Sequence, residues 1–270
     1  MDLGLENATA VVAGGTKGMG RAIAESLAGE GAKVAVLARD QLVIDETVSM
    51  LLGRGAAEAI GFATDLTSEP NVRRSMKAVG ERWSSLNILV NAAGPVEVGI
   101  GRFEDIDDAE WQATFDIGVL SAVRTVRAAL PLLRSALWAR VVNLSAHSTK
   151  RQSTELVAYT AAKSALTSMT KNLSALLASD QILVNTVSPG SFLSEGMKGY
   201  LRSLPSDRNV DSDSLVDAMR VITEDYGHPA LLGRAADPGE IGPLVAFLCS
   251  PANTYITGAD INIDGGSDFT

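Results

Sequence analysis

The chain has 270 residues, 46% of them hydrophobic, and a formal net charge of −9 with a sequence pI of about 4.8. This length and composition predict a single domain over residues 1–270 that buries one substantial core. The acidic balance argues against nucleic acid and against an anionic membrane surface as partners, because like charges repel.

The N-terminus and the cysteine content limit the cellular setting. The first apolar run, residues 8–13, follows no basic segment and is too short for a signal peptide or a membrane span. The single cysteine, Cys249, excludes an internal disulfide, and its apolar neighbours favour a buried, inert thiol. We therefore expect a soluble, cytoplasmic protein without a metal site.

The chain opens with a strand at residues 9–13, a glycine turn, a helix around Ile23 and Leu27, and a second strand at residues 33–38. This βαβ order implies parallel strands covered by helices. The alternation continues with strands at 57–63, 86–90, 140–144, 182–187 and 260–263, and with helices at 69–83, 108–137, 155–177 and 238–248.

Seven strands that alternate with helices predict the α/β class. We expect a single-domain, Rossmann-like, doubly wound parallel sheet of about seven strands with helices on both faces. Residues 191–236 are long and mixed in character. We expect this segment to form a mobile excursion from the sheet edge.

A glycine-rich loop follows the first strand and opens the first helix. Glycines let the backbone approach a pyrophosphate, and a helix N-terminus supplies N–H groups and a partial positive charge. A turn selected only for its backbone angles is the plainer interpretation, but the βαβ context favours a nucleotide site. Its expected members are Gly14, Thr16, Lys17, Gly18 and Met19.

The end of the second strand indicates which nucleotide is preferred. An acidic residue there would favour NAD, because it bonds the ribose hydroxyls. The strand instead ends in Ala38-Arg39-Asp40, and the cations of Arg39 and Lys17 both suit a 2′-phosphate. Asp40 could pair with Arg39 or lie near the ribose. We predict NADP(H) as the cofactor, with NAD(H) less favoured.

Tyr159 and Lys163 are four residues apart, which places them on one face of the expected helix. A neighbouring ammonium favours the phenolate and lowers the pKa of a phenol, so the pair could exchange a proton with a carbonyl or hydroxyl. A packed ring beside a solvated charge is the commoner explanation for such a pair.

These motifs together resemble the short-chain dehydrogenase/reductase family over nearly the whole chain. The resemblance is closest to the branch of bacterial 3-oxoacyl-carrier-protein reductases and hydroxysteroid dehydrogenases. It rests on their order and spacing: the glycine loop, Asp65-Leu66, Asn91-Ala92-Ala93-Gly94, Tyr159-x-x-x-Lys163, the Asn185 to Gly190 motif, and the runs Ile256 to Gly258 and Asp264 to Gly266.

The resemblance implies a role for each matching residue. Tyr159 would exchange the proton, and Lys163 would lower the pKa of Tyr159 and bond the nicotinamide ribose. Asp65 and Leu66 would contact adenine. The rest of the cofactor would be held by Asn91, Ala92, Gly94, Pro189, Gly190, Phe192 and Ser194, where Ser194 replaces the family's usual threonine. The excursion would close over the substrate.

Two positions depart from the family pattern. The serine expected thirteen residues before Tyr159, which would polarise the carbonyl, is Ala146. Loss of one such donor should slow the reaction by about 10²-fold or more. Ser145, His147 or Ser148 could replace it, and Ser145 is slightly favoured as a catalytic residue. A strand cap and a surface imidazole are the plainer interpretations of Ser145 and His147.

The second departure is Gly118, seven positions after Trp111, where the family has an asparagine in a proton relay. Glycine has no side chain to bond water and costs a helix roughly 1 kcal/mol against alanine. A backbone carbonyl with a bound water could still serve such a relay.

Three functions stay open from the sequence. The first is an NADP-dependent oxidoreductase that moves hydride between nicotinamide and a carbonyl or secondary alcohol. The second is a cofactor-binding protein with weak or no redox activity, suggested by Ala146 and Gly118. The third is a reductase whose substrate supplies its own polarising group.

Partners follow from the apolar surfaces. The helices at 108–137 and 155–177 are apolar on more than one face, which indicates burial in the core, under the loop or against another subunit. The family resemblance implies that these two helices form a dimer interface, so we expect a homo-oligomer, a dimer or more often a tetramer. The substrate is expected to be a small-molecule carbonyl or alcohol. Apolar residues of the excursion suit a bulky apolar ligand, or they pack among themselves: Phe192, Leu193, Met197, Tyr200, Leu201 and Leu204.

Overall fold

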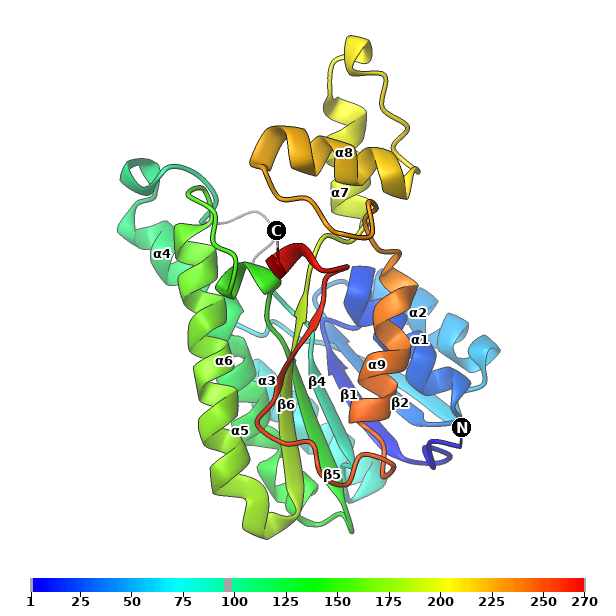
Figure 1. The fold of residues 1–270 in the computed structure, drawn as a ribbon. Coiled ribbons are helices and arrows are strands. Elements are labelled where there is room, and N and C mark those ends of the chain that lie inside the picture. Colours follow the sequence, from blue (N-terminus) through cyan, green and yellow to red (C-terminus); the bar gives the residue numbers. More distant parts are fainter. Residues whose placement is uncertain (1, 95–98, 270) are drawn as a thin grey trace.

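The computed structural model describes residues 2–94 and 99–269. Seven parallel strands form one sheet in the order β3-β2-β1-β4-β5-β6-β7 (Figure 1). The strands are β1 Thr9–Ala13, β2 Lys33–Ala38, β3 Glu58–Ala63, β4 Ile88–Asn91, β5 Ala139–Leu144, β6 Ile182–Pro189 and β7 Asp260–Ile263. The predicted fold class is confirmed, and each predicted strand end lies within two residues of the observed one.

Helices cover both faces of the sheet because alternate strand residues point to opposite sides. In β1, Ala10 and Val12 belong to one apolar core, and Val11 and Ala13 belong to the other. The first core is covered by α1 (Gly18–Gly29), α2 (Gln41–Arg54) and α9 (Ile241–Leu248). The second is covered by α3 (Glu69–Trp83), α5 (Ser121–Arg134) and α6 (Val157–Leu177). Over residues 2–94 and 99–269, each helix is too short or too polar to cross a bilayer.

The helix α2 between β2 and β3 was not predicted from the sequence. The carboxylate of Asp40 caps its start by accepting from the N–H groups of Leu42 and Val43 at 2.9 and 3.4 Å. Gly55 ends it in the left-handed conformation, with φ 111°. Only three residues of α2 are fully buried, so its apolar periodicity is weak although both of its end signals are present.

The helix predicted at 108–137 is interrupted and ends at Arg134. It consists of α4 (Asp108–Phe115), a π-helical turn (Asp116–Leu120) and α5. Gly118 is buried within the π-helical turn. Such turns commonly mark a functional position in a helix.

The excursion is helical rather than irregular. After β6 it forms α7 (Glu195–Ser203) and α8 (Leu215–Tyr226), which lie beyond the carboxyl ends of the strands in Figure 1. It returns through a bridge between Phe192 and Ala236. Its apolar side chains form a small core of their own, which contains Leu193, Met197, Tyr200, Leu201, Leu204, Val210, Leu215, Ala218, Val221 and Ala235. Mutual packing accounts for these residues, so they no longer argue for an apolar substrate.

Candidate active site

The predicted site motifs meet at the carboxyl edge of the sheet. Strand register places the ends of neighbouring strands at one level: Ala13 pairs with Asn91, and Asn91 pairs with Asn143, the last residue but one of β5. The strand order reverses between β1 and β4, and open α/β sheets bind ligands at such a switch point. The glycine loop and the segment after Asn91 flank this point.

The glycine loop is tightly packed against the neighbouring strand connection. A Cβ atom at Gly14, whose φ is +82°, would lie 2.8 Å from the backbone nitrogen of Ala93. A Cβ atom at Gly20 would lie 2.1 Å from the carbonyl oxygen of Gly14. These contacts require glycine at both positions, since a real Cβ atom cannot approach backbone so closely. Gly18, with φ +51°, instead faces open space.

The start of α1 is suited to an anion. Its N-cap residue, Lys17, makes no side-chain bond to the first turn, and that turn contains no acidic residue. The first N–H groups of α1 are therefore not capped by a side chain, whereas Asp40 caps α2. Uncapped N–H groups and the helix dipole together favour a bound phosphate.

Two exposed cations lie at this edge of the sheet, Lys17 at the start of α1 and Arg39 after β2. Arg39 and Lys17 are exposed, and neither side chain forms a hydrogen bond or an ion pair within the described part of the chain. Oδ1 of Asp40 caps α2, and Asp40 forms no ion pair with Arg39 among the described residues. Asp65 accepts from the hydroxyl and the N–H of Thr67, and these bonds lower its pKa, with a smaller contribution from Arg39. Leu66 is buried beside it.

Tyr159 and Lys163 both lie on α6, as predicted. The Lys163 ammonium is 3% exposed and donates to the carbonyl oxygen of Leu144 at 2.8 Å. A Cβ atom at Gly94 would lie 3.2 Å from Lys163 Nζ, so the glycine leaves room for the ammonium. Burial lowers the pKa of Lys163 to about 8.

The expected direction of the Tyr159 pKa shift is wrong for this structure. Burial raises the pKa of Tyr159 to about 12 instead of allowing Lys163 to lower it. The reason is loss of solvation on burial, which disfavours the charged phenolate. Tyr159 is therefore protonated at neutral pH, which is the state of a proton donor.

The candidates near Ala146 differ in their bonding. Ser145 donates to the carbonyl oxygen of Lys163 at 3.1 Å and lies 2.8 Å from the Thr167 hydroxyl, so its hydroxyl is engaged with α6. His147 Nδ1 lies 3.2 Å from the carbonyl oxygen of Pro189, and burial lowers its pKa. The Ser148 hydroxyl is buried and has no hydrogen-bond partner among the described residues. This geometry favours Ser148 over Ser145 as an available hydroxyl.

The side chain of Asn91 has a structural role that the sequence analysis missed. It accepts from Thr125 at 2.6 Å and donates to Asn143 at 2.8 Å, and Asn143 donates to Thr170 at 2.8 Å. This buried chain of polar groups joins β4 and β5 to α5 and α6. Because the Asn91 side chain is engaged, a cofactor could contact this segment only through the backbone of Asn91 and through Ala92 and Gly94. The sequence signal for this role is that Asn91 and Asn143 both lie near the carboxyl ends of strands that are adjacent in the sheet.

In the segment after β6, too, the side chains have structural roles. A Cβ atom at Gly190 would lie 2.6 Å from the Cα of Asp264, so glycine is required where Pro189 ends the strand. The Phe192 ring is buried in the core. The Ser194 hydroxyl caps α7 by accepting from the Met197 N–H at 3.3 Å. Both side chains therefore have structural partners.

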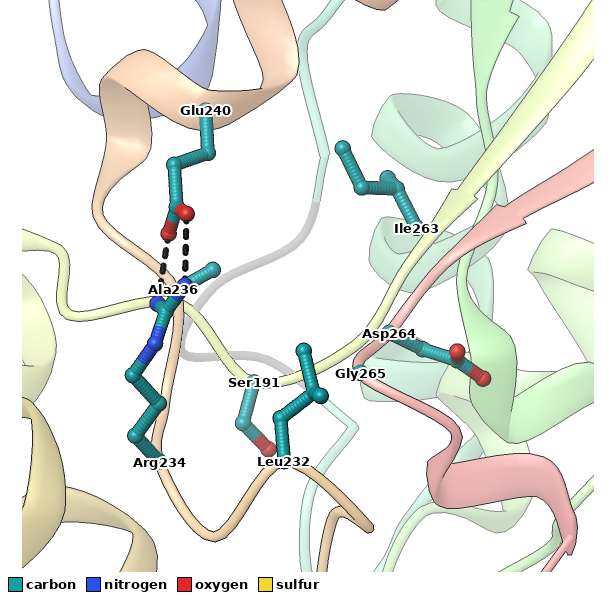
Figure 2. Close-up of a pocket in the computed structure, with 8 residues that line it drawn as sticks. All are labelled: Ser191, Leu232, Arg234, Ala236, Glu240, Ile263, Asp264 and Gly265. Carbon is teal, nitrogen blue, oxygen red and sulfur yellow. Dashed lines mark hydrogen bonds and ion pairs between the residues drawn. The ribbon is translucent and has the colours of Figure 1, made fainter.

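A pocket of about 210 Å³ lies beside the end of β7 (Figure 2). Arg234 and Glu240 face each other in it through two bonds of 2.7 Å, and this pair lowers the pKa of Glu240 to about 2. The Asp264 carboxylate points away from that ion pair in Figure 2. None of the sequence-predicted site residues lines this pocket, whose lining is Ser191, Leu232, Arg234, Ala236, Glu240, Ile263, Asp264 and Gly265.

Known proteins match the chain over nearly its full length. A family model described as enoyl-(acyl carrier protein) reductase matches residues 13–268. An uncharacterized oxidoreductase of Bacillus subtilis is 33% identical over 268 residues, which cover 98% of each chain. The rhamnolipids biosynthesis 3-oxoacyl-[acyl-carrier-protein] reductase of Pseudomonas aeruginosa is 32% identical over 262 residues, which cover 95% of this chain and 94% of that protein.

A solved structure shares the whole fold. L-sorbose reductase from Gluconobacter frateurii, complexed with NADPH and L-sorbose, has a TM-score of 0.91 to this chain at 27% identity. The match covers 100% of both chains. The agreement therefore extends to the excursion as well as to the sheet.

Proposed function

The chain belongs to the short-chain dehydrogenase/reductase family of oxidoreductases, and we propose that it reduces a carbonyl with NADPH, using Tyr159 as the proton donor. The observation that carries this proposal is the pair on α6, in which the half-buried Tyr159 phenol lies one helical turn from the buried Lys163 ammonium. NADPH, when bound, supplies the hydride.

Tyr159 donates its proton to the oxygen of the substrate as negative charge develops there. Lys163 stabilises the phenolate that remains, and its bond to the Leu144 carbonyl holds the ammonium in position. The raised pKa of Tyr159 favours reduction at neutral pH, because the phenol then carries the proton that the alkoxide needs. The pKa of Lys163 predicts that reduction slows as the pH rises above about 8.

The cofactor preference follows from the uncapped start of α1 and the two free cations. The N–H groups of α1 would hold the pyrophosphate, and Lys17 and Arg39 would neutralise a 2′-phosphate. NADH lacks that phosphate and would leave both cations without a ligand partner. Asp65 and Leu66 would face adenine, and Gly94, Pro189 and Gly190 would line the nicotinamide end.

The test is a comparison of NADPH and NADH binding, followed by absorbance at 340 nm with a panel of ketones and acyl thioesters. We expect tighter binding of NADPH and turnover that falls by at least about 10³-fold in Tyr159→Phe. Tyr255→Phe is the matched control, because Tyr255 is 96% exposed and should keep wild-type turnover. Equal turnover in Tyr159→Phe and wild type would contradict the proposal.

Ala146 supports a second candidate function, a cofactor-binding protein with weak or no redox activity. The side chain at this position is buried and cannot donate a hydrogen bond to a carbonyl. Tight NADPH binding without turnover on any member of the panel would favour this second candidate. Failure to bind either nucleotide would count against both.

We also propose that the chain forms a homo-oligomer. Leu176 on α6 and Leu120 next to α5 are 66% and 43% exposed, so apolar surface remains on the helices that the sequence analysis singled out. Burial of this surface against a second copy would remove it from water. Light scattering coupled to size exclusion tests the proposal, and a monomer at micromolar concentration would contradict it.

A further inference from the structure

The excursion, residues 191–236, has an interior of its own. α7 and α8 share the small apolar core described above, and Met197 of α7 joins Met219 of α8 in a second cluster. The excursion also contains internal ion pairs, such as that of Lys198 with Asp213 at 2.8 Å. Because these contacts lie within the excursion, we expect it to keep its shape when its position relative to the sheet changes.

The two ends of the excursion meet at its root. The Leu193 N–H donates to the carbonyl oxygen of Ala236, and the Ala236 N–H donates to that of Ser191, both at 2.9 Å. The ion pair of Arg234 with Glu240 at 2.7 Å fixes the returning chain to the residue before α9. These bonds hold the root, so the orientation of α7 and α8 over the sheet depends on a further attachment.

Arg151 provides such an attachment from outside the excursion. Its guanidinium donates to the carbonyl oxygens of Gly227 at 2.8 Å and Pro229 at 3.4 Å, in the turn that follows α8. It also donates to the carbonyl oxygen of Ser267 at 2.7 Å, in the C-terminal turn. A guanidinium carries several N–H donors in one fixed plane, so a single side chain can hold the carbonyl groups of separate segments together.

Arg151 is itself fixed to the segment that carries Ala146. Its N–H donates to the carbonyl oxygen of His147 at 3.1 Å, in the turn directly after Ala146. This turn packs against the C-terminal turn and against α6, the helix of Tyr159. Burial lowers the pKa of His228, and the Arg151 charge lowers it further, so the guanidinium acts on the turn after α8 as well. Arg151 therefore joins the excursion to the elements that carry the proposed catalytic residues.

We propose that Arg151 is a positioning residue for the reduction: it holds the excursion over the carboxyl edge of the sheet and thereby sets the affinity for the carbonyl substrate. This role rests on the proposed function, because it requires a substrate bound beside Tyr159. The excursion lies beyond the carboxyl ends of the strands (Figure 1), so its position determines how much of that edge is covered. Without Arg151, fewer molecules hold the excursion in this position, and the apparent affinity for substrate falls by that fraction.

Steady-state kinetics of Arg151→Met at saturating NADPH test this role. Cyclohexanone and acetoacetyl-coenzyme A represent the ketones and acyl thioesters of the panel, and the one that the wild type reduces faster is the probe. We expect KM to rise by about tenfold or more, while kcat stays within about threefold because the reacting groups are unchanged. Arg134→Met is the matched control, since Arg134 ends α5, pairs with Asp180 at 2.8 Å and should leave KM at the wild-type value.

Arg151→Lys separates the joining of segments from the effect of charge. An ammonium keeps the positive charge but lacks the planar fork that reaches several carbonyl groups. We expect KM in Arg151→Lys to stay at least about fivefold above the wild-type value. A wild-type KM in either Arg151→Lys or Arg151→Met would overturn the positioning role. Reduction that still depends on Tyr159 would leave the proposed function intact in that case.

Hydrogen exchange tests the attachment without any substrate, and it decides the question if neither probe is reduced. In Arg151→Met, the amides of residues 227–233 should exchange about tenfold faster or more; they include the Leu232 N–H, which donates to the carbonyl oxygen of Gly265 at 3.1 Å. The amides within α7 and α8 should keep their wild-type rates, because the internal core remains. Unchanged exchange at 227–233, or loss of protection throughout α7 and α8, would overturn the role of Arg151.

Discussion

The two halves of the carboxyl edge of the sheet present different chemical groups to a ligand. Between β2 and β4, the edge offers backbone N–H groups, glycines and the exposed cations Lys17 and Arg39. Between β5 and β7, it offers buried side chains, of which Lys163 and Ser148 are both less than 5% exposed. The first half offers exposed cations and backbone N–H groups to an anion, whereas the second half holds its polar side chains in buried positions.

This difference explains why neighbouring residues of one type have different roles. Ser145 and Ser148 are three positions apart, yet Ser145 is bonded to α6 and Ser148 has no partner within the described ranges. In the half between β5 and β7, hydrogen bonds to neighbouring residues decide which side chain is available to bond a substrate. The following changes test the contrast between the two halves.

The largest effect is expected at Lys163. Lys163→Met removes the ammonium that stabilises the Tyr159 phenolate, and we expect carbonyl reduction to fall by about 10³-fold or more while NADPH binding weakens much less. Lys171→Met is the control, because Lys171 also lies on α6 and donates to a backbone carbonyl, that of Gly258, at 2.9 Å. Turnover at 340 nm and NADPH titration separate the two effects.

The same substitution should stabilise the fold. Because burial lowers the pKa of Lys163 to about 8, the folded chain releases this proton before the unfolded chain does, and the free energy of unfolding rises with pH between about 8 and 10.5. Below pH 8 the buried ammonium costs stability. Lys163→Met should therefore raise the free energy of unfolding at pH 7 by about 1–2 kcal/mol, after loss of the bond to Leu144. A lower melting temperature would contradict this account.

An effect of intermediate size on kcat is expected from a substitution of Ala146. Ala146→Ser places a hydroxyl where the family has its carbonyl-polarising donor, and we expect kcat to increase by about 10²-fold. The added oxygen is small, but it enters a buried position, so the melting temperature is measured alongside. Ser145→Ala is the comparison and should not reduce kcat by more than its effect on stability explains. An unchanged kcat in a folded Ala146→Ser would show that another group already polarises the carbonyl.

A smaller, more selective effect is expected in the cofactor half. Arg39→Gln removes a cation proposed to bind the 2′-phosphate, and the Kd of NADPH should rise by about tenfold or more while that of NADH changes little. Arg54→Gln is a control on the same side of the sheet, where Arg54 pairs with Glu25 at 3.4 Å. A parallel loss of both nucleotides in Arg39→Gln would contradict a phosphate-specific role.

The smallest effect on catalysis is expected at the buried chain of polar groups that begins at Thr125 and joins β4 to β5. Thr125→Val removes the donor to Asn91 and leaves a buried amide oxygen unpaired, which should lower the free energy of unfolding by about 1–3 kcal/mol. The preference for NADPH over NADH should not change. Thr154→Val, at an exposed position, is the control in the same chemical denaturation series. Equal stability of the two variants would show that the chain of polar groups between β4 and β5 contributes little.

Much of the fold was predictable from local patterns. The central strands β1, β2 and β4 follow from short apolar runs, because a parallel strand covered on both faces is buried along its length, whereas the edge strand β7 alternates polar and apolar residues. The helix α2 was missed because its periodicity is weak, although Asp40 and Gly55 mark its ends. The break at Gly118 was also missed, because a single π-helical turn is too short to interrupt the helical periodicity that continues on both sides of it.

The sequence by itself determined the family, the order of strands and helices along the chain, and the glycine loop after the first strand. These depend on backbone constraints that a residue type expresses locally, such as the absence of room for a Cβ atom at Gly14 and Gly20. Tertiary structure alone decided the direction of the Tyr159 pKa shift, the bonding of Ser145 to α6 and the lack of a partner for the Ser148 hydroxyl among the described residues. Burial and partners depend on segments that are distant in the chain, and no local pattern specifies them.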